Sequence, residues 1–564
     1  MLRRRLLRLL SGKLPLLLCA AFFLAATGYP LVLLLLQSIF PEFLGGRWDG
    51  FLDPYRRMFA TPDIVRMLWN SLAWAGSVTV VSWIFGIPCG YLLARTDLPG
   101  KLWARLTLLV PIMTPPYIAA LSYILIMQEG GFADIVFGGL PGGARSLFFS
   151  FWGVTLVMAL SSYGYVALAV EASLRSLPSR LEDAAAILGA DWRARARHIL
   201  LPLLLPAILN SGLLVFLEAL SNFGVPAVLG TRSNLPLLPA EIFYLVTSWP
   251  VDLPLATSLS SLLCLFALIS LYASRWLGAR GGKAVYRPGV SRLVRLRRWC
   301  TVAGWGLFGG LFFAAALLPY MAMVLTSLAD RWGEGLPRLT LRHYGALFEP
   351  GSRGMGALAT STGLSFAAAT TCVFLGGYAA YVSIRAEGPL QKVLDGLALL
   401  PRVLPKIVMA VALILAWNAP WVRIDIYNTV WMLLLAYVVI YITDALNYAN
   451  ASLRSVSERL ENAAAILGAS RLTVFRRVVL PQLRPALVAA WLTTFIVCMR
   501  ELVASILLLP PGVDTTATFI FNQFEQGDIS AAMAMATVTI LVSSAVLIAF
   551  QLRQSEHGRG LPAK

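Results

Sequence analysis

Four side chains that can carry charge or hydrogen bonds stand out among those inside the long apolar runs of this sequence. They are Glu218, Asn222, Arg500 and Glu501. Ionisable groups are costly in hydrocarbon, and those retained there commonly mark a substrate or ion path. We therefore predict that these four residues line a path or its gate, with Arg500 pairing a carboxylate. Structural pairing between helices is the alternative.

Other chemistry-bearing residues form no recognisable constellation. The three histidines, His198, His343 and His557, are scattered, and none of the six cysteines forms a CxxC pair. These spacings indicate no metal site, no disulfide framework and no catalytic cluster. No phosphate-binding Gly-x-x-x-x-Gly-Lys-Ser/Thr loop is present either. We expect neither an enzyme nor a cofactor bound by this chain.

The composition identifies the solvent around the chain. Hydrophobic residues make up 58% of the 564 and charged residues only 13%, with a mean hydropathy of +0.74. Soluble domains carry roughly 25% charged residues. The chain therefore belongs in a lipid bilayer, where its net charge of +18 is explained by basic loops at the membrane surface. Nucleic-acid binding is not expected.

Twelve apolar runs are long enough to cross a bilayer as helices, which need about 20 residues. Spanning segments must satisfy their own backbone hydrogen bonds, and the alternation typical of a membrane barrel is absent. We predict an all-α membrane protein with about twelve transmembrane helices. They cover residues 14–37, 70–95, 104–128, 152–172, 204–228, 254–276, 299–327, 360–385, 394–417, 429–448, 485–509 and 529–552.

One long repeat organises these spans. Residues 173–208 recur as 452–487, with twenty of 36 positions identical and no gap. Such a repeat indicates two related halves. We predict a first half of six spans over residues 1–276, a basic linker over 277–298 and a second half of six spans over 299–564. Both halves run in the same direction, as a parallel duplication does.

The distribution of Lys and Arg predicts the orientation. Residues 275–298 carry eight Lys or Arg and no acid, whereas residues 510–528 carry no Lys or Arg and three acids. Positive loops stay in the cytoplasm. Both repeated loops and both chain termini are therefore predicted to be cytoplasmic.

The repeat also relates the intramembrane polar residues. At the offset of 279, Glu501 corresponds to Asn222, and Val497 corresponds to Glu218. Glu218 and Asn222 are four residues apart, so a continuous helix would present them on one face. One symmetric position thus holds an amide in one half and a carboxylate in the other.

Each repeated loop has the signals of a short helix. Ser179 and Ser455 each precede a Glu by three residues, the spacing of a capping box. Alanine, the best helix former, follows in a run of three, and Gly189 or Gly468 then offers a helix end. We predict a short, smooth helix in each loop.

These loops resemble the EAA loop of permease subunits in binding-protein-dependent ABC importers. That motif reads Glu-Ala-Ala, three residues, Gly, nine residues, then Ile-x-Leu-Pro. Here Asp183 and Asn462 stand at the motif's Glu, with Glu182 and Glu461 one residue upstream. The remaining matches are Ala184, Ala185, Gly189, Ile199, Leu201 and Pro202 in the first copy, and Ala463, Ala464, Gly468, Val478, Leu480 and Pro481 in the second.

The resemblance implies a mechanism. In this family the loop helix is a coupling helix that docks on a cytoplasmic ATPase. Two ATPase copies, which hold ATP and magnesium, drive alternating access, and a periplasmic binding protein delivers the solute. Two fused halves resemble permeases of the iron(III) type and also the thiamine type. The expected location is the bacterial inner membrane.

Other functions were weighed against iron(III) import. Within the same architecture, the solute could be thiamine, an organophosphonate or a polyamine. An ion-coupled secondary carrier would share twelve spans but has no need of two Ala-rich loops. A membrane-embedded enzyme would need a catalytic constellation that the sequence does not display.

Overall fold

The computed structural model describes residues 14–177, 184–185, 187–281, 293–330, 338–386 and 388–559. These residues form helices, and their only β-structure is a pair of isolated bridges. Eleven helices are long and apolar enough to cross a membrane, or twelve if the bent pair α19–α20 counts as one span. The predicted all-α fold with about twelve spans is confirmed.

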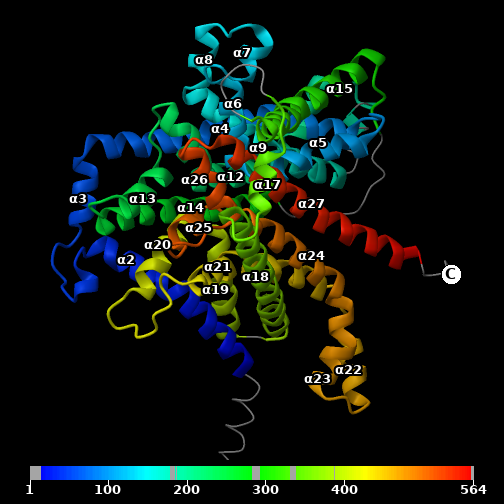
Figure 1. Ribbon diagram of the computed structural model, residues 1–564. Coiled ribbons are helices and arrows are strands. Elements are labelled where there is room, and N and C mark those ends of the chain that lie inside the picture. Colours follow the sequence, from blue (N-terminus) through cyan, green and yellow to red (C-terminus); the bar gives the residue numbers. More distant parts are fainter. Residues whose placement is uncertain are drawn as a thin grey trace, which may run out of the picture. The chain divides into compact units, whose positions relative to one another are not determined.

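The spans follow the predicted order (Figure 1). They are Leu14–Ile39, which ends in α2 (Tyr29–Ile39), α4 (Pro62–Arg95), α5 with α6 (Lys101–Met113, Pro116–Met127), α9 (Phe151–Ser176), α12 (Leu201–Ser221), α14 (Leu253–Gly281), α15 with α16 (Arg298–Phe312, Leu318–Leu328), α18 (Arg353–Ile384), α19 with α20 (Pro389–Val403, Lys406–Trp417), α21 (Val430–Leu453), α24 (Leu480–Met499) and α27 (Ile529–Arg559).

Shorter helices connect the spans. They are α3 (Asp53–Ala60), α7 (Phe132–Phe137), α8 (Gly142–Phe148), α11 (Trp192–Arg195), α13 (Leu238–Thr247), α17 (Arg342–Phe348), α22 (Glu458–Ile466), α23 (Arg471–Val474), α25 (Val503–Leu508) and α26 (Thr516–Glu525).

The predicted runs 104–128 and 394–417, each expected as one helix, are both broken, and the membrane-crossing candidate in the first of them is Pro116–Phe137. In the third span α5 ends at Met113 and α6 starts at Pro116; in the ninth, α19 and α20 meet at an angle of 115°. The residues before Pro115 and Pro405 are extended, with ψ of 127° and 138°. Proline disfavours helical backbone in the residue before it, which explains both breaks.

The fifth and eleventh spans also end earlier than predicted. The helix α12 stops at Ser221 and α24 stops at Met499. A π-helical turn, η4 (Pro226–Gly230), and the short helix α25 follow these stops. Asn222 and Glu501 therefore lie at helix breaks rather than inside a helix.

The helices group into two compact units that differ from the two halves of the repeat. Unit 1 contains Met1–Tyr55, Val246–Ser261 and Thr340–Lys564, and unit 2 contains Arg56–Leu245 and Leu262–Leu339. The first span thus belongs with helices of the second half, and the seventh span with helices of the first half. The two halves predicted from the repeat describe how the sequence is duplicated, and they are not the same as the two compact units.

Specific contacts hold each exchanged span within its unit. In unit 1 the Tyr29 hydroxyl donates to the Ala416 carbonyl at 3.4 Å, and α2 packs beside α20 (Figure 1). In unit 2 the Tyr320 and Thr114 hydroxyls are 2.8 Å apart, and the Tyr123 hydroxyl donates to the Ala314 carbonyl. In the same unit α15 packs against α5, and α16 packs against α6.

Close helix packing recurs at one symmetric glycine in each unit. A Cβ atom at Gly86 of α4 would lie 2.7 Å from the Tyr163 carbonyl oxygen of α9. A Cβ at Gly376 of α18, its counterpart 290 residues later, would lie 3.0 Å from the Ile442 carbonyl oxygen of α21. Membrane helices approach closely at small residues. The same contact therefore builds the core of both units.

Candidate functional site

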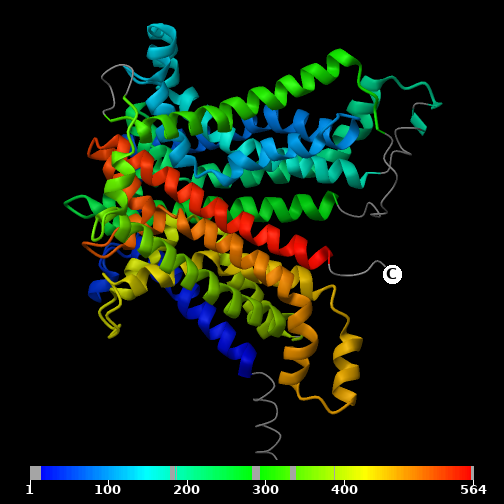
Figure 2. The same cartoon turned by 45° about the vertical axis from the view of Figure 1, so that its right-hand side comes forward.

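The second repeated loop contains the short helix that its sequence predicts. The helix α22 ends in a turn at Gly468, whose φ is +85°, and the Ala469 N–H donates to the Ala464 carbonyl at 3.1 Å. A left-handed glycine is the common way to end a helix. In Figures 1 and 2 this loop projects beyond the end of α24.

The predicted cap at Ser455 is wrong. The Ser455 hydroxyl donates to the Ser452 carbonyl at 2.7 Å, within the turn that ends α21. The helix α22 instead starts after Ser457, whose Oγ accepts the Arg459 N–H at 3.3 Å. Ser455 lies three residues before the helix start at Glu458, and Ser457 lies directly before it. The Ser-x-x-Glu spacing therefore selected the wrong serine.

The first repeated loop ends in the same way. Glu182, Asp183 and the predicted cap Ser179 lie outside the described residues. Ala185 is helical, and its carbonyl accepts the Ala190 N–H at 2.9 Å around Gly189, whose φ is also +85°. The glycine end of the predicted helix is therefore present in both loops.

Two apolar side chains stand exposed at the tip of each loop. Ile187 and Leu188 are 86% and 87% exposed, and Ile466 and Leu467 are 85% and 87% exposed. Solvent-facing apolar groups that adjoin one another mark interaction surfaces. We call each pair an apolar tip. The Ile-Leu-Gly sequence, identical in both copies, is the signal that could have revealed it.

A charged pair ties the second loop to the membrane helices. Arg385, the residue that caps α18, forms an ion pair with Glu461 of α22, and both side chains are largely buried. In unit 2 the equivalent arginine, Arg95, donates to the Leu177 carbonyl at 3.2 Å, where the first loop begins. An arginine at the end of the same span thus contacts both loops.

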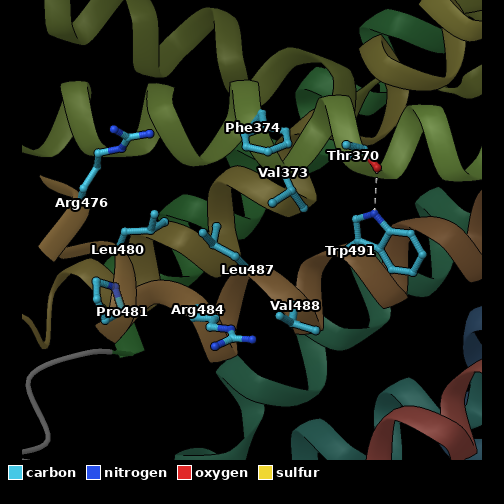
Figure 3. A pocket seen from close by; sticks show the side chains of 10 residues that line it. All are labelled: Thr370, Val373, Phe374, Arg476, Leu480, Pro481, Arg484, Leu487, Val488 and Trp491. Carbon is cyan, nitrogen blue, oxygen red and sulfur yellow. Dashed lines mark hydrogen bonds between the residues drawn. The ribbon is translucent and has the colours of Figure 1, made fainter. Parts of the chain in front are cut away.

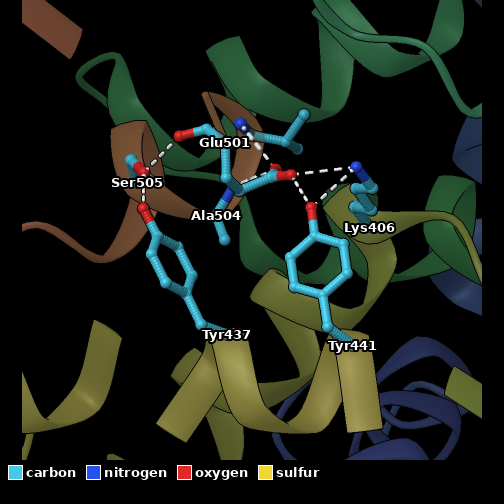
Figure 4. A network of polar contacts seen from close by, with 7 residues as sticks. Lys406, Tyr437, Tyr441, Glu501, Ala504 and Ser505 are labelled. Carbon is cyan, nitrogen blue, oxygen red and sulfur yellow. Dashed lines mark hydrogen bonds and ion pairs between the residues drawn. The ribbon is translucent and has the colours of Figure 1, made fainter. Parts of the chain in front are cut away.

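A buried polar network occupies the break after α24 (Figure 4). The Glu501 side chain is 3% exposed, and its Oε2 lies 2.9 Å from the Lys406 ammonium and accepts the Tyr441 hydroxyl. Its Oε1 accepts the N–H groups of Val503 and Ala504 at 3.1 and 3.3 Å. Both carboxylate oxygens are therefore fully engaged.

This network joins three elements of unit 1. Glu501 caps the first turn of α25, a position that favours a negative charge. Lys406 is the first residue of α20, directly after the break at Pro405, and Tyr441 lies in α21. The Tyr437 and Ser505 hydroxyls, 2.7 Å apart, add a second link between α21 and α25. Loss of Lys406 would leave the buried Glu501 carboxylate without its cation, which is destabilising, so the network stabilises the breaks before α20 and α25.

The sequence predicts that Glu501 lines a path or its gate, and the structure adds how its carboxylate is held. Its carboxylate is enclosed within unit 1, and the cation paired with it is Lys406, whose side chain is 39% exposed. Arg500 ends α24 and is half-buried. Lys406 was missed, although a lysine inside the apolar run 394–417 satisfies the same rule that selected Glu501.

Glu218 and Asn222 lie at the end of α12 and differ in their surroundings. Glu218 is exposed on α12, whereas Asn222 follows the helix end with ψ of 122°. The Asn222 Oδ1 accepts the Val225 N–H at 2.9 Å. Glu501 accepts the N–H of Ala504 in the same i+3 relation. The amide and the carboxylate therefore share one capping role.

Only the second half carries the charged version of this cap. The counterparts of Lys406 and Tyr441 in the first half are Pro116 and Ser162. The uncharged amide of Asn222 needs no counter-ion, which accounts for the uncharged residues at these two positions. Within the residues described, no three His, Cys, Asp or Glu side chains are grouped so that they could hold a metal ion.

Comparison with known proteins decides the family. Residues 86–280 and 372–556 each match the family described as binding-protein-dependent transport system inner membrane component. The chain belongs to this family. Its two matches make it a fused pair of permease halves of an ABC importer, in line with the EAA-loop resemblance. Such a multi-pass inner-membrane permease works with an ATPase and a substrate-binding protein.

Three relatives illustrate the range of this permease family. The ferric transport system permease protein FbpB of Actinobacillus pleuropneumoniae is 28% identical over 521 residues, 88% of this chain and 72% of the relative. A putative ferric transport system permease protein of Haemophilus influenzae is 28% identical over 80% of this chain and 72% of its own. A putative 2-aminoethylphosphonate permease protein of Salmonella paratyphi A, 28% identical, covers 41% of this chain and 87% of its own.

Proposed function

We propose that this permease imports iron(III) from the periplasm to the cytoplasm by alternating access. The observation that carries the proposal is the share of this chain that the ferric relatives match. It is 88% and 80%, so both halves are included. The phosphonate relative matches 41% of the chain. A phosphonate, thiamine or polyamine is the alternative solute.

Two copies of a cytoplasmic ATPase supply the energy in this proposal. Each apolar tip, Ile187 with Leu188 and Ile466 with Leu467, would enter a cleft of one copy, where burial of apolar surface favours binding. The exposure of all four side chains and their repetition in both loops support this role. ATP and magnesium are assigned to the ATPase rather than to this chain.

The Arg385–Glu461 pair would transmit movement of the second loop to α18. The pair is largely buried, so the loop helix and the end of the span move together more readily than through an exposed pair. Glu182, Asp183 and Asn462 keep their proposed places in the coupling loops.

Glu501 acts in this proposal as a positioning residue for the gate. It holds the starts of α20 and α25 in place, while Asn222 caps the equivalent break in unit 2. Glu218 and Arg500 remain proposed pathway residues. A change in the breaks between helices would then open or close the path.

Transport of radioactive ferric ion into proteoliposomes tests the proposed solute. The vesicles would contain the full chain with its ATPase, and the purified binding protein would be added outside. We expect ATP-dependent accumulation of iron that stops when ATP is replaced by a non-hydrolysable analogue. Labelled 2-aminoethylphosphonate, thiamine and spermidine serve as matched alternatives. Uptake of one of these without uptake of iron would overturn the iron proposal and retain the permease.

A further inference from the structure

A groove in unit 1 runs between α18 and the start of α24 (Figure 3). Its volume is about 630 Å³, and most of its lining is apolar. The π-helical turn η6 (Phe475–Val479) forms one end of it. The lining residues are Thr370, Val373, Phe374, Arg476, Leu480, Pro481, Arg484, Leu487, Val488 and Trp491.

Trp491 forms a fixed apolar end of the groove. Its indole N–H donates to the Thr370 hydroxyl at 3.0 Å. Its ring stacks on Phe495 at 5.2 Å between centroids and meets the Phe366 ring edge-on at 5.5 Å. Because the indole is bonded and packed on two sides, this end presents a rigid apolar surface.

The other end of the groove carries two exposed guanidinium groups. Arg476 lies on η6 and Arg484 one turn into α24, at the end of span eleven that is predicted to be cytoplasmic. Neither arginine forms an ion pair with any residue that the structure describes. Guanidinium groups bind phosphate oxygens through paired hydrogen bonds.

In the first half a tryptophan fills the equivalent space. Trp83 replaces Val373, and its indole N–H donates to the Ile208 carbonyl at 3.1 Å. Gly212 replaces Trp491, and a Cβ atom there would lie 2.3 Å from the Trp83 ring. The exchange of large and small residues closes one groove and opens the other.

The charge at this place differs between the halves as well. Arg484 has Leu205 as its counterpart, whereas Arg476 has Arg197. A basic residue before each Leu-Pro pair is therefore shared, but the second arginine is found only beside the open groove. The open apolar space and the second arginine therefore occur together in the second half. This combination suits a ligand with both an apolar and an anionic part.

We propose that this groove binds one anionic phospholipid. Its phosphate would lie between Arg476 and Arg484, and an acyl chain would lie along the apolar lining as far as Trp491. Basic pockets between membrane helices on the cytoplasmic side are suited to anionic headgroups. The lipid would bridge α18 and α24 next to the second repeated loop, and so would stabilise the segment that leads into that loop.

Lipid retention in nanodiscs tests the proposal. The full chain is reconstituted in phosphatidylcholine with a small fraction of phosphatidylglycerol, and bound lipid is counted by native mass spectrometry after release. We expect one retained phosphatidylglycerol, with binding about fivefold weaker in Arg484→Leu and about thirtyfold weaker in Arg476→Gln/Arg484→Leu. Arg197→Gln in the first half is the matched control and should retain the lipid.

A second variant blocks the apolar part without changing charge. Val373→Trp/Trp491→Gly copies the packing of Trp83 and Gly212, so it should exclude the acyl chain while both arginines remain. If this variant and the wild type retain phosphatidylglycerol equally, the groove does not hold the acyl chain of the lipid. An equal loss in Arg197→Gln, or release by millimolar inorganic phosphate alone, would also overturn the proposal.

Discussion

At the residue scale, the two halves cap the same helix break with different side chains, a carboxylate in one and an amide in the other. The break after α24 leaves N–H groups at the start of α25, and the Glu501 carboxylate accepts two of them. Asn222 accepts one at the equivalent break in unit 2. A carboxylate placed there needs a cation, and Lys406 provides it. The two halves therefore differ in the charge of the capping side chain, and only the charged one requires a cation beside it.

Glu501→Gln should destabilise the protein. The variant keeps the shape of the side chain but removes the charge opposite Lys406, and we expect a loss of about 2 kcal/mol, since Lys406 is partly exposed. The measurement is the thermal unfolding midpoint in detergent. Glu218→Gln, at an exposed position on α12, is the control and should change stability by less than about 0.5 kcal/mol. Equal midpoints for both variants would contradict the structural role of the Glu501 pair.

At the element scale, the repeated loops combine two features that act on different partners. The apolar tips face outward, whereas Glu461 faces back to Arg385 at the end of α18. A helix this short gains most of its stability from such contacts rather than from propensity. The loop is thus held by the chain on one side and exposes apolar groups on the other.

Replacing one apolar tip should weaken binding of the ATPase. Burial of one Ile or Leu contributes about 1.5–3 kcal/mol, so the loss of both in Ile466→Ser/Leu467→Ser should lower the affinity by at least about a hundredfold. The affinity is measured with purified ATPase on the reconstituted chain. Ile187→Ser/Leu188→Ser tests the other loop by the same readout. Full affinity in both variants would exclude the tips as docking groups.

Arg385→Gln should separate ATP hydrolysis from transport. The loop helix would still expose its apolar tip, so the ATPase should bind with nearly wild-type affinity. Transport per ATP hydrolysed should fall severalfold, since movement of α22 would no longer reach α18 through the ion pair. Arg353→Gln removes a more exposed pair with Asp514, 2.8 Å apart, and is the control. A proportional loss of hydrolysis and transport would argue against transmission through Arg385.

At the scale of the whole molecule, the exchange of the first and seventh spans links the two halves. Each compact unit contains a span contributed by the other half of the sequence. The contacts of Tyr29 with Ala416 and of Tyr320 with Thr114 lie inside these units. Neither half can therefore form its own unit completely.

Two separately expressed halves should associate. Residues 1–276 and 299–564, produced in one cell, are expected to co-purify, because each supplies a span that packs in the other's unit. Either half produced alone should be degraded or aggregate, as its apolar contact surface lacks the exchanged span. Co-purification is measured through a tag on one half. A well-folded second half that lacks residues 1–55 would contradict the exchange.

Sequence alone determined the membrane class, the number and order of the spans, the duplication and the short Ala-rich helix of the second loop. These features depend on composition, run length and local propensity, which act over a few turns of chain. Gly468 could be recognised as a helix end for the same reason.

Only the tertiary structure decided which elements meet. The Glu501–Lys406 and Arg385–Glu461 pairs join residues 95 and 76 positions apart, and the exchange of spans joins regions hundreds of residues apart. An ionisable residue inside an apolar run predicts that it has a charged or polar partner. Which residue is that partner depends on how the helices pack. The break after α24 places the Glu501 carboxylate where it caps the first turn of α25 and pairs with Lys406.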